Sequence, residues 1–181
     1  MSSNQPVKKP IEILFSYAHE DEALRDKLEK HLSSMKRQNR IVCWYDRNIR
    51  AGNSWNKTIS AHLDTAQIIL LLVSADFLDS DYCNSVEVKR ALQRHQKGEA
   101  RVIPIILRKC DWHNEKFAAL QALPRDAKPV VNWSNQDDAL YDVAIGIKKL
   151  VEEFEKEQTT KPFASPSLWN IPLRQIGRAH V

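Results

Sequence analysis

One glutamate stands out among the residues that could do chemistry. The stretch SADFLDSDYCNSVEVKRAL places Glu87 about one turn into a predicted helix, at the edge of the face that would pack inward. A carboxylate held in a crevice can stabilise a developing positive charge. Arg90 follows three residues later, so a solvated ion pair on the helix surface explains the same pattern. Cys83 lies one turn before Glu87, but a Cys–Glu pair without a base is not a nucleophile site. These residues alone leave both interpretations of Glu87 open.

A second stretch, ILFSYAHEDEAL, places polar groups directly after an apolar run. Ser16 and Tyr17 directly follow the predicted first strand, where a hydroxyl and an aromatic ring can contact a ligand. The alternative is an ordinary turn, in which Glu20 or Asp21 opens a helix through its dipole.

A third stretch, CWYDRNIRAGNSWNKTI, predicts a strand followed by a charged loop that starts at Asp46. The loop is either a plain surface loop or a mobile lid whose Arg47 and Arg50 can bind anionic phosphates. Trp44 and Trp55 are interpreted as core or interface residues rather than as platforms for ligand stacking.

Apolar runs and segments of helical period alternate along the chain about five times, which favours an α/β fold with a parallel sheet. The expected strands are residues 11–15, 41–45, 68–73, 102–107 and 129–133, and the expected helices are 22–35, 55–66, 82–95, 113–123 and 137–157. A flavodoxin-like doubly wound five-stranded sheet has the order 2-1-3-4-5, and ligands bind where that order reverses. Ser16 and Tyr17 would then lie beside Ser74, with Glu87 bordering the same crevice. Pro104 indicates a bulge or a position away from the sheet centre.

Composition narrows the classes of function. The 181 residues are 43% hydrophobic and 28% charged, which is typical of one globular domain with a tail. The net charge of +4 is spread among interspersed acidic and basic residues, so neither a nucleic-acid partner nor a membrane partner is expected. Three cysteines without a CxxC pair argue against disulfides and a zinc site and favour the cytoplasm. GxxxxGK[ST], GxGxxG, HExxH and GxSxG are absent, so no bound cofactor or metal is expected.

Taken together and in this order, the three stretches resemble the Toll/interleukin-1 receptor (TIR) domain, in its bacterial form. FSYAHED is similar to the first box of the family, WYDRNIRAGNSW to the second and SADFLDSDYCNSVEVKRAL to the third. RVIPIILRKCDWH and LQALPRDAKPVVNW are similar to the remainder of the bacterial group. The resemblance covers about residues 10 to 155. One departure is Cys83, which stands where many enzymatic members have a tryptophan, with Tyr82 just before it.

The resemblance implies an NAD+ nucleosidase that releases nicotinamide and leaves ADP-ribose or a cyclic isomer, in bacterial immune (antiphage) signalling. It implies that Glu87 is catalytic and that NAD+ is a substrate rather than a cofactor. Substrate contacts would come from the residues Ser16, Tyr17, Asp46, Arg47, Arg50, Trp55, Tyr82 and Cys83. The loop 46–53 would also bind other TIR domains, in a homo-oligomer or filament.

Rival functions share the expected fold. A non-catalytic TIR adaptor needs the loop but not Glu87. A phosphate-receiver domain needs acidic residues after the first strand and an aspartate ending the third, and this chain has Phe15-Ser16-Tyr17 and Val73-Ser74 there. A nucleoside-sugar transferase would release a base from nucleosides rather than from NAD+.

The ends of the chain differ from its middle. Residues 1–10 are polar with two prolines and predict a disordered leader before a domain at 11–157. Residues 158–175 predict a linker toward a downstream module. The last six residues, IGRAHV, match the translation of a common sequencing adapter, so residues 176–181 are expected to be an artefact of DNA sequencing.

Overall fold

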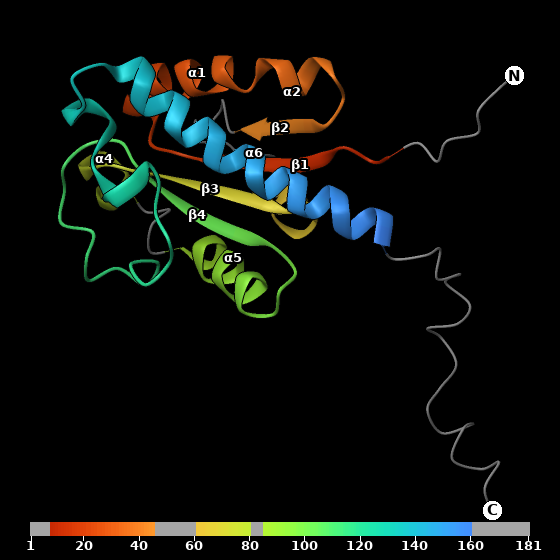
Figure 1. The fold of residues 1–181 in the computed structure, drawn as a ribbon. Helices are drawn as coiled ribbons and strands as arrows, with labels where there is room; N and C mark the ends of the chain where they lie inside the picture. The colour runs from red at the N-terminus through yellow and green to blue at the C-terminus, as the bar shows by residue number, and fades with distance from the viewer. Residues whose placement is uncertain (1–7, 46–60, 81–84, 161–181) are drawn as a thin grey trace, which may run out of the picture.

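A computed structural model describes residues 8–45, 61–80 and 85–160 and shows helices packed on both faces of a parallel sheet (Figure 1). Four strands in these ranges pair in the order β2-β1-β3-β4. They are β1 (Ile11–Ser16), β2 (Ile41–Tyr45), β3 (Ile68–Val73) and β4 (Arg101–Ile106). The predicted fold class and the order of its first four strands are therefore confirmed. β3 is completely buried, as expected for an uninterrupted apolar run in the middle of a parallel sheet.

Helices cover both faces of the sheet. One face packs against α1 (Glu22–His31), α2 (Ser33–Arg37) and α6 (Gln136–Thr160). The other packs against a helix described at residues 61–65, α4 (Ala75–Asp79) and α5 (Val86–Gln96). Figure 1 shows α1 and α6 on the opposite side of the sheet from α5. Within the described ranges, none of the helices combines the length and apolar character needed to cross a lipid bilayer.

The outer edge of β4 pairs with one residue, Leu123, among those that the structure describes. The Val102 N–H donates to Nδ1 of His95 at 3.0 Å, and the Ile106 N–H donates to the Leu123 carbonyl at 2.8 Å. Between them stands Pro104, which has no N–H. Its pairing with Leu71 continues the register without a bulge, so the prediction that Pro104 lies away from the sheet centre is confirmed.

A fifth strand at residues 129–133 was predicted, and this is wrong. These residues hold a 3-10 helix, η3 (Val130–Asn132), preceded by another, η2 (Arg125–Ala127). Only a single parallel bridge, between Ile105 and Leu123, extends the described sheet beyond β4. Pro124 and Pro129 lack the N–H groups that a parallel ladder requires, so the segment forms isolated bonds rather than a ladder. One of them joins the Val131 N–H to the Leu107 carbonyl at 3.1 Å.

A helix at residues 113–123 was also predicted, and this too is wrong. The segment folds into successive turns held by bonds between residues three apart, such as Ala118 N to Glu115 O and Leu120 N to Phe117 O, both 3.0 Å. Phe117 is buried against the sheet face that carries α5. The apolar residues of this segment therefore reflect the burial of the Phe117 ring, not the apolar face of a helix.

Two helical boundaries differ from the expected ones. The predicted helix 22–35 is interrupted at Leu32 (φ −97°, ψ 0°), which separates α1 from α2. Residues 74–81 were predicted as a loop, but α4 lies there, capped by the Ser74 hydroxyl, which accepts a hydrogen bond from the Phe77 N–H. Serine at an N-cap followed by Phe77 and Leu78 is a helix-start signal that the sequence contained.

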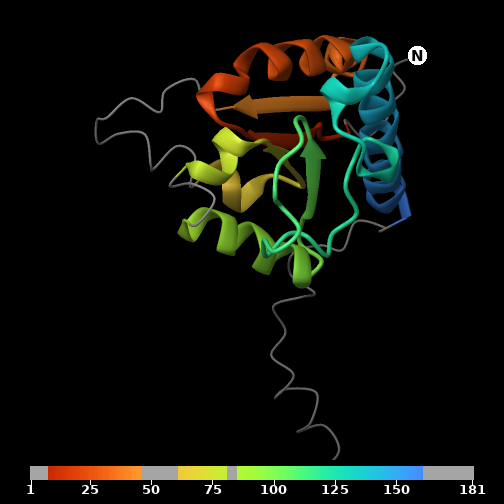
Figure 2. The same ribbon diagram turned by 90° about the vertical axis from the view of Figure 1, so that its left-hand side faces the viewer.

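The topology fixes where the candidate residues meet. In a parallel sheet all carboxyl ends lie at one edge, and α5 must begin at that edge because it runs back to the start of β4. Figure 2 views the molecule toward this carboxyl edge. The order reverses between β1 and β3, which is the crevice where sheets of this type bind ligands.

Candidate functional site

Glu87 lies in the first turn of α5. The helix begins after Ser85, whose hydroxyl accepts a 3.5 Å bond from the Val88 N–H. The Glu87 side chain is partly buried, and it forms no hydrogen bond or ion pair with any residue in the described ranges. Arg90 donates instead to the Asp64 carboxylate at 2.5 Å. The surface pair between Glu87 and Arg90 is therefore not the arrangement in the structure.

Ser16 ends β1 on the side of the sheet that carries α5. Side chains alternate along a strand, and Leu14 and Ala18 both pack in the cluster with Ala91 of α5. Ser16 is only 6% exposed, and its hydroxyl has no hydrogen-bond partner in the part of the chain that the structure describes. A buried hydroxyl without a partner is unfavourable and marks a position where a ligand could supply the missing bond.

Tyr17 faces the opposite side of the sheet. Its ring belongs to the cluster beneath α1 and α6, and the guanidinium of Arg25 lies 5.4 Å from the ring centroid. The same guanidinium lies 3.9 Å from the ring centroid of Tyr45, and it donates to Glu29 at 2.7 Å. The structure thus separates two adjacent predicted contacts, since Ser16 shares a face with α5 and Tyr17 does not.

A buried carboxylate joins three loops at the carboxyl end of the sheet. In the alternative of an ordinary turn, Glu20 or Asp21 opens a helix; Asp21 does stand at the N-cap of α1, but its side chain makes no cap bond and is completely buried. One carboxylate oxygen accepts the Ser74 hydroxyl, and the other accepts Nε–H of Arg108 at 3.2 Å. Burial, the largest cause, raises the pKa of Asp21, and the bonds from Ser74 and Arg108 oppose that rise. Asp21 stands between Glu20 and Glu22 in the sequence, and this run of acidic residues gave no signal for its long-range role.

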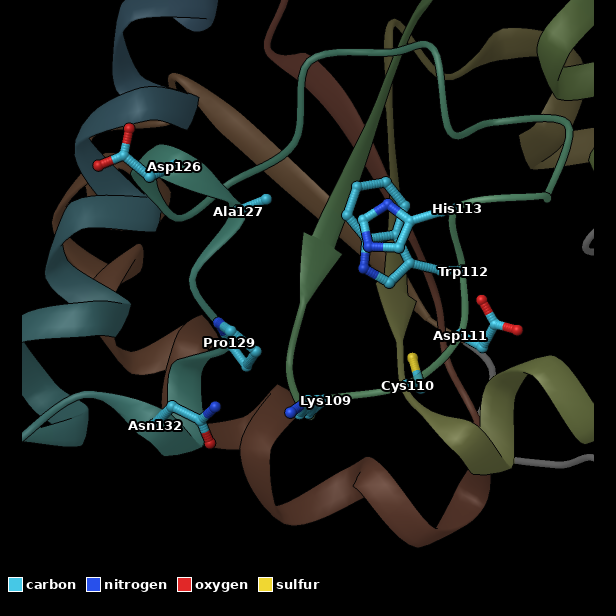
Figure 3. Close-up of a pocket in the computed structure, with 9 residues that line it drawn as sticks. All are labelled: Lys109, Cys110, Asp111, Trp112, His113, Asp126, Ala127, Pro129 and Asn132. Atoms are coloured by element: carbon cyan, nitrogen blue, oxygen red, sulfur yellow. The ribbon is translucent and has the colours of Figure 1, made fainter.

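A pocket of about 690 Å³ lies just beyond Arg108. Figure 3 shows one wall from the segment after β4, with Cys110, Trp112 and His113, and the facing wall from residues 126–132. The Trp112 and His113 rings lie 4.3 Å apart. The volume of the pocket falls within the range of small-molecule sites. None of its lining residues was among the predicted substrate contacts.

Burial sets the protonation state of the two described cysteines, Cys43 and Cys110. Burial raises the pKa of Cys43 to about 12, and burial likewise raises the pKa of Cys110. Both thiols are therefore held in the protonated, unreactive form at neutral pH. No group of three or more potential metal-binding side chains occurs among the residues described.

The arrangement can now be compared with known proteins. A family model described as "TIR domain" matches residues 13–142, which is most of the chain. The chain belongs to the TIR domain family. The match contains Ser16, Asp21, Glu87 and Arg108, so every described residue of the site lies inside the TIR domain.

Two further likenesses accompany this TIR domain. It is 49% identical over 150 residues to "Uncharacterized protein y4lF" of Sinorhizobium fredii (strain NBRC 101917 / NGR234), an alignment that covers 83% of this chain and 46% of that protein. The chain therefore spans less than half the length of this relative. It is also similar to a chain in the "Structure of the activated Roq1 resistosome directly recognizing the pathogen effector XopQ (TIR domains)", with 14% identity, a TM-score of 0.44 and coverage of 81% and 80% of the two chains.

Several predicted contacts lie outside the described residues. They are Asp46, Arg47, Arg50, Trp55, Tyr82 and Cys83. Their roles remain predictions. Trp44, expected in the core or an interface, stacks on His62 with ring centroids 3.9 Å apart.

Proposed function

We propose that this TIR domain is an NAD+ nucleosidase that breaks the bond between nicotinamide and ribose, with Glu87 as the catalytic carboxylate. The observation that carries the proposal is the state of Glu87. It is partly buried at the carboxyl edge, and no partner in the described ranges occupies it. Structural carboxylates in this protein behave differently, since Asp21 and Glu155 are both engaged by arginines.

The chemistry needs one carboxylate. Nicotinamide leaves with the electron pair of the C1′–N bond, which neutralises its positive ring, so no acid is required. The ribose becomes oxocarbenium-like, and an anionic side chain beside it stabilises that charge. Water then adds to C1′ and loses a proton to give ADP-ribose, or a nucleophile within the substrate closes a cyclic isomer.

Ser16 is proposed to complete the site from the sheet. Its buried hydroxyl can donate to or accept from a ribose hydroxyl, which would supply the bond that it lacks in the described structure. The outlying contacts at Tyr17, Asp46, Arg47, Arg50, Trp55, Tyr82 and Cys83 are kept as proposals. We also propose self-association through the loop 46–53. We also propose a role in immune signalling in bacteria, the kind of organism that has the y4lF relative.

The test measures nicotinamide release from NAD+ by the wild type, Glu87→Ala and Glu20→Ala. Glu20 is an exposed carboxylate after β1 at the same edge, so its removal makes the same change in charge. Loss of an electrostatic group of this kind lowers turnover by about 10² to 10³, and we expect that loss for Glu87→Ala alone. A dilution series tests self-association, which predicts that specific activity rises with protein concentration.

Two results would contradict the proposal. Near-native turnover by Glu87→Ala would remove the catalytic role. A folded wild type that releases no nicotinamide at any concentration would leave a docking module that binds other TIR domains.

A further inference from the structure

Arg108 follows β4, yet its guanidinium reaches across the sheet. β4 and β1 are separated by β3, so their ends are two strand spacings apart, about 10 Å. The Arg108 Nε nevertheless lies 3.2 Å from a carboxylate oxygen of Asp21, in the connection that follows β1. Ser74, at the end of β3, bonds the other oxygen of the same carboxylate. The guanidinium is therefore held over the ends of β1 and β3, where the strand order reverses.

The way Arg108 binds Asp21 leaves most of its donors available. An arginine that serves only to neutralise a carboxylate usually binds it through two parallel N–H bonds. Here Ser74 takes one oxygen, so the guanidinium contacts Asp21 through Nε alone. Its two terminal nitrogens have no hydrogen bond or ion pair in the ranges that the structure covers, and the side chain is 49% exposed. A fixed, half-exposed fork of N–H donors suits the oxygens of a phosphate.

The local charges set limits on the ligand. Asp76, in the first turn of α4, is close enough for its charge to raise the pKa of Asp21. Burial and two donors hold Asp21 on the protein side of the guanidinium. The available donors of Arg108 therefore provide a directional anion site rather than a broad basic patch.

We propose that Arg108 binds the pyrophosphate of the dinucleotide, with Asp21 and Ser74 as positioning residues. The assignment rests on the proposed function, because it is the NAD+ substrate that brings a pyrophosphate to this edge. It adds a contact that the sequence analysis did not include. It also gives a physical reason for a fully buried carboxylate beside the ligand crevice.

The test uses ADP as a probe that carries the pyrophosphate but no nicotinamide bond to cleave. Isothermal titration calorimetry would compare the wild type with Arg108→Ala and Arg108→Gln. Arg101→Ala is the matched control, because Arg101 starts the same strand at the opposite end, is 53% exposed and contacts only Glu153, at 3.8 Å, within the described residues. Loss of hydrogen bonds to a charged group weakens binding by roughly tenfold to a hundredfold, and we expect that for both Arg108 variants.

Arg108→Gln keeps an amide that can still donate to Asp21. If Arg108→Ala does not fold, the ADP affinity of Arg108→Gln tests the proposal. Equal ADP affinity in the wild type and in folded Arg108→Gln would overturn the proposal, as would a wild type that does not bind ADP. Arg101→Ala is expected to bind ADP as the wild type does. Failure of the proposed function would show elsewhere, as intact NAD+ after incubation with a protein that binds ADP through Arg108.

Discussion

At the amino end of the sheet polar side chains are bonded to backbone groups, whereas at the carboxyl end Ser16 and Glu87 have no such partner in the described residues. At the amino end, the Gln67 side chain accepts the Glu12 N–H at 2.8 Å, and the Arg94 guanidinium donates to three carbonyls. The two ends are built by the same four strands. The difference between them indicates that the amino end contributes stability and that the carboxyl end keeps polar groups for a ligand.

The same contrast appears within β4 alone. Arg101 begins the strand and Arg108 lies two residues beyond its end, with similar exposure, but of the two only Arg108 contacts a completely buried carboxylate. A buried carboxylate is unfavourable unless it is bonded on all sides, so its presence at one end needs a reason that the other end does not.

The largest change in stability is expected at the amino end, from Arg94→Ala. Nη1 of Arg94 donates to the carbonyls of Leu63 and Ala66 at 2.6 and 2.7 Å, and Nη2 donates to Glu99 O at 3.2 Å. The carbonyls of Leu63 and Ala66 lie at the C-terminal end of the helix described at residues 61–65. The Arg94 side chain is only 13% exposed. Loss of these bonds should lower the free energy of unfolding by about 2–4 kcal/mol.

Urea unfolding would measure this effect, with Arg94→Lys as a variant that keeps the charge but cannot reach all three carbonyls. Turnover of NAD+ at a temperature where the variant is folded should match the wild type. A variant that loses activity while keeping its stability would contradict the division of roles between the two ends.

The sequence predicted the parts of the fold that have one strong period. β2 and β3 begin and end at the predicted residues, because their apolar runs are short and bounded by polar turns. Predictions failed in the segment 113–133, where two prolines and one buried ring outweigh local propensity. The periodicity of apolar residues depends on residues close together in the sequence. It therefore could not predict how this segment lies beside β4.

The candidate site was predictable in position but not in its bonds. The topology placed Ser16 and Glu87 at one edge, and the structure does so too. The contact between Asp21 and Arg108 joins residues 87 positions apart, and no local pattern in either stretch predicts it. Successive side chains of a strand point to opposite faces of the sheet. A predicted first strand that ended at Ser16, one residue later, would therefore have placed the Ser16 and Tyr17 side chains on opposite faces.

A smaller change of opposite sign is expected at the carboxyl end, from Ser16→Ala. The buried hydroxyl has no described partner, so removing it should raise the free energy of unfolding by about 1 kcal/mol. The same change should lower kcat/KM for NAD+, because the proposed bond to the ribose is lost. Thermal unfolding and a nicotinamide assay on one preparation would show both effects, and a Ser16→Ala protein that is less stable and equally active would show that the hydroxyl is structural.

The smallest effect is expected at His95, at the amino end, and it depends on pH. Nδ1 of His95 accepts the Val102 N–H, which only the neutral ring can do, and burial together with the Arg101 charge lowers the pKa of this imidazole below 6.5. The folded-state pKa lies below the unfolded one, so the bond contributes stability above pH 6.5 that is lost as the pH falls through and below that value. Glutamine does not titrate in this range. The free energy of unfolding of His95→Gln should therefore be lower than that of the wild type by up to about 1 kcal/mol at neutral pH. That difference in the free energy of unfolding should shrink toward pH 5, whereas a difference that is constant with pH would mean that His95 does not protect the edge of β4 through this bond.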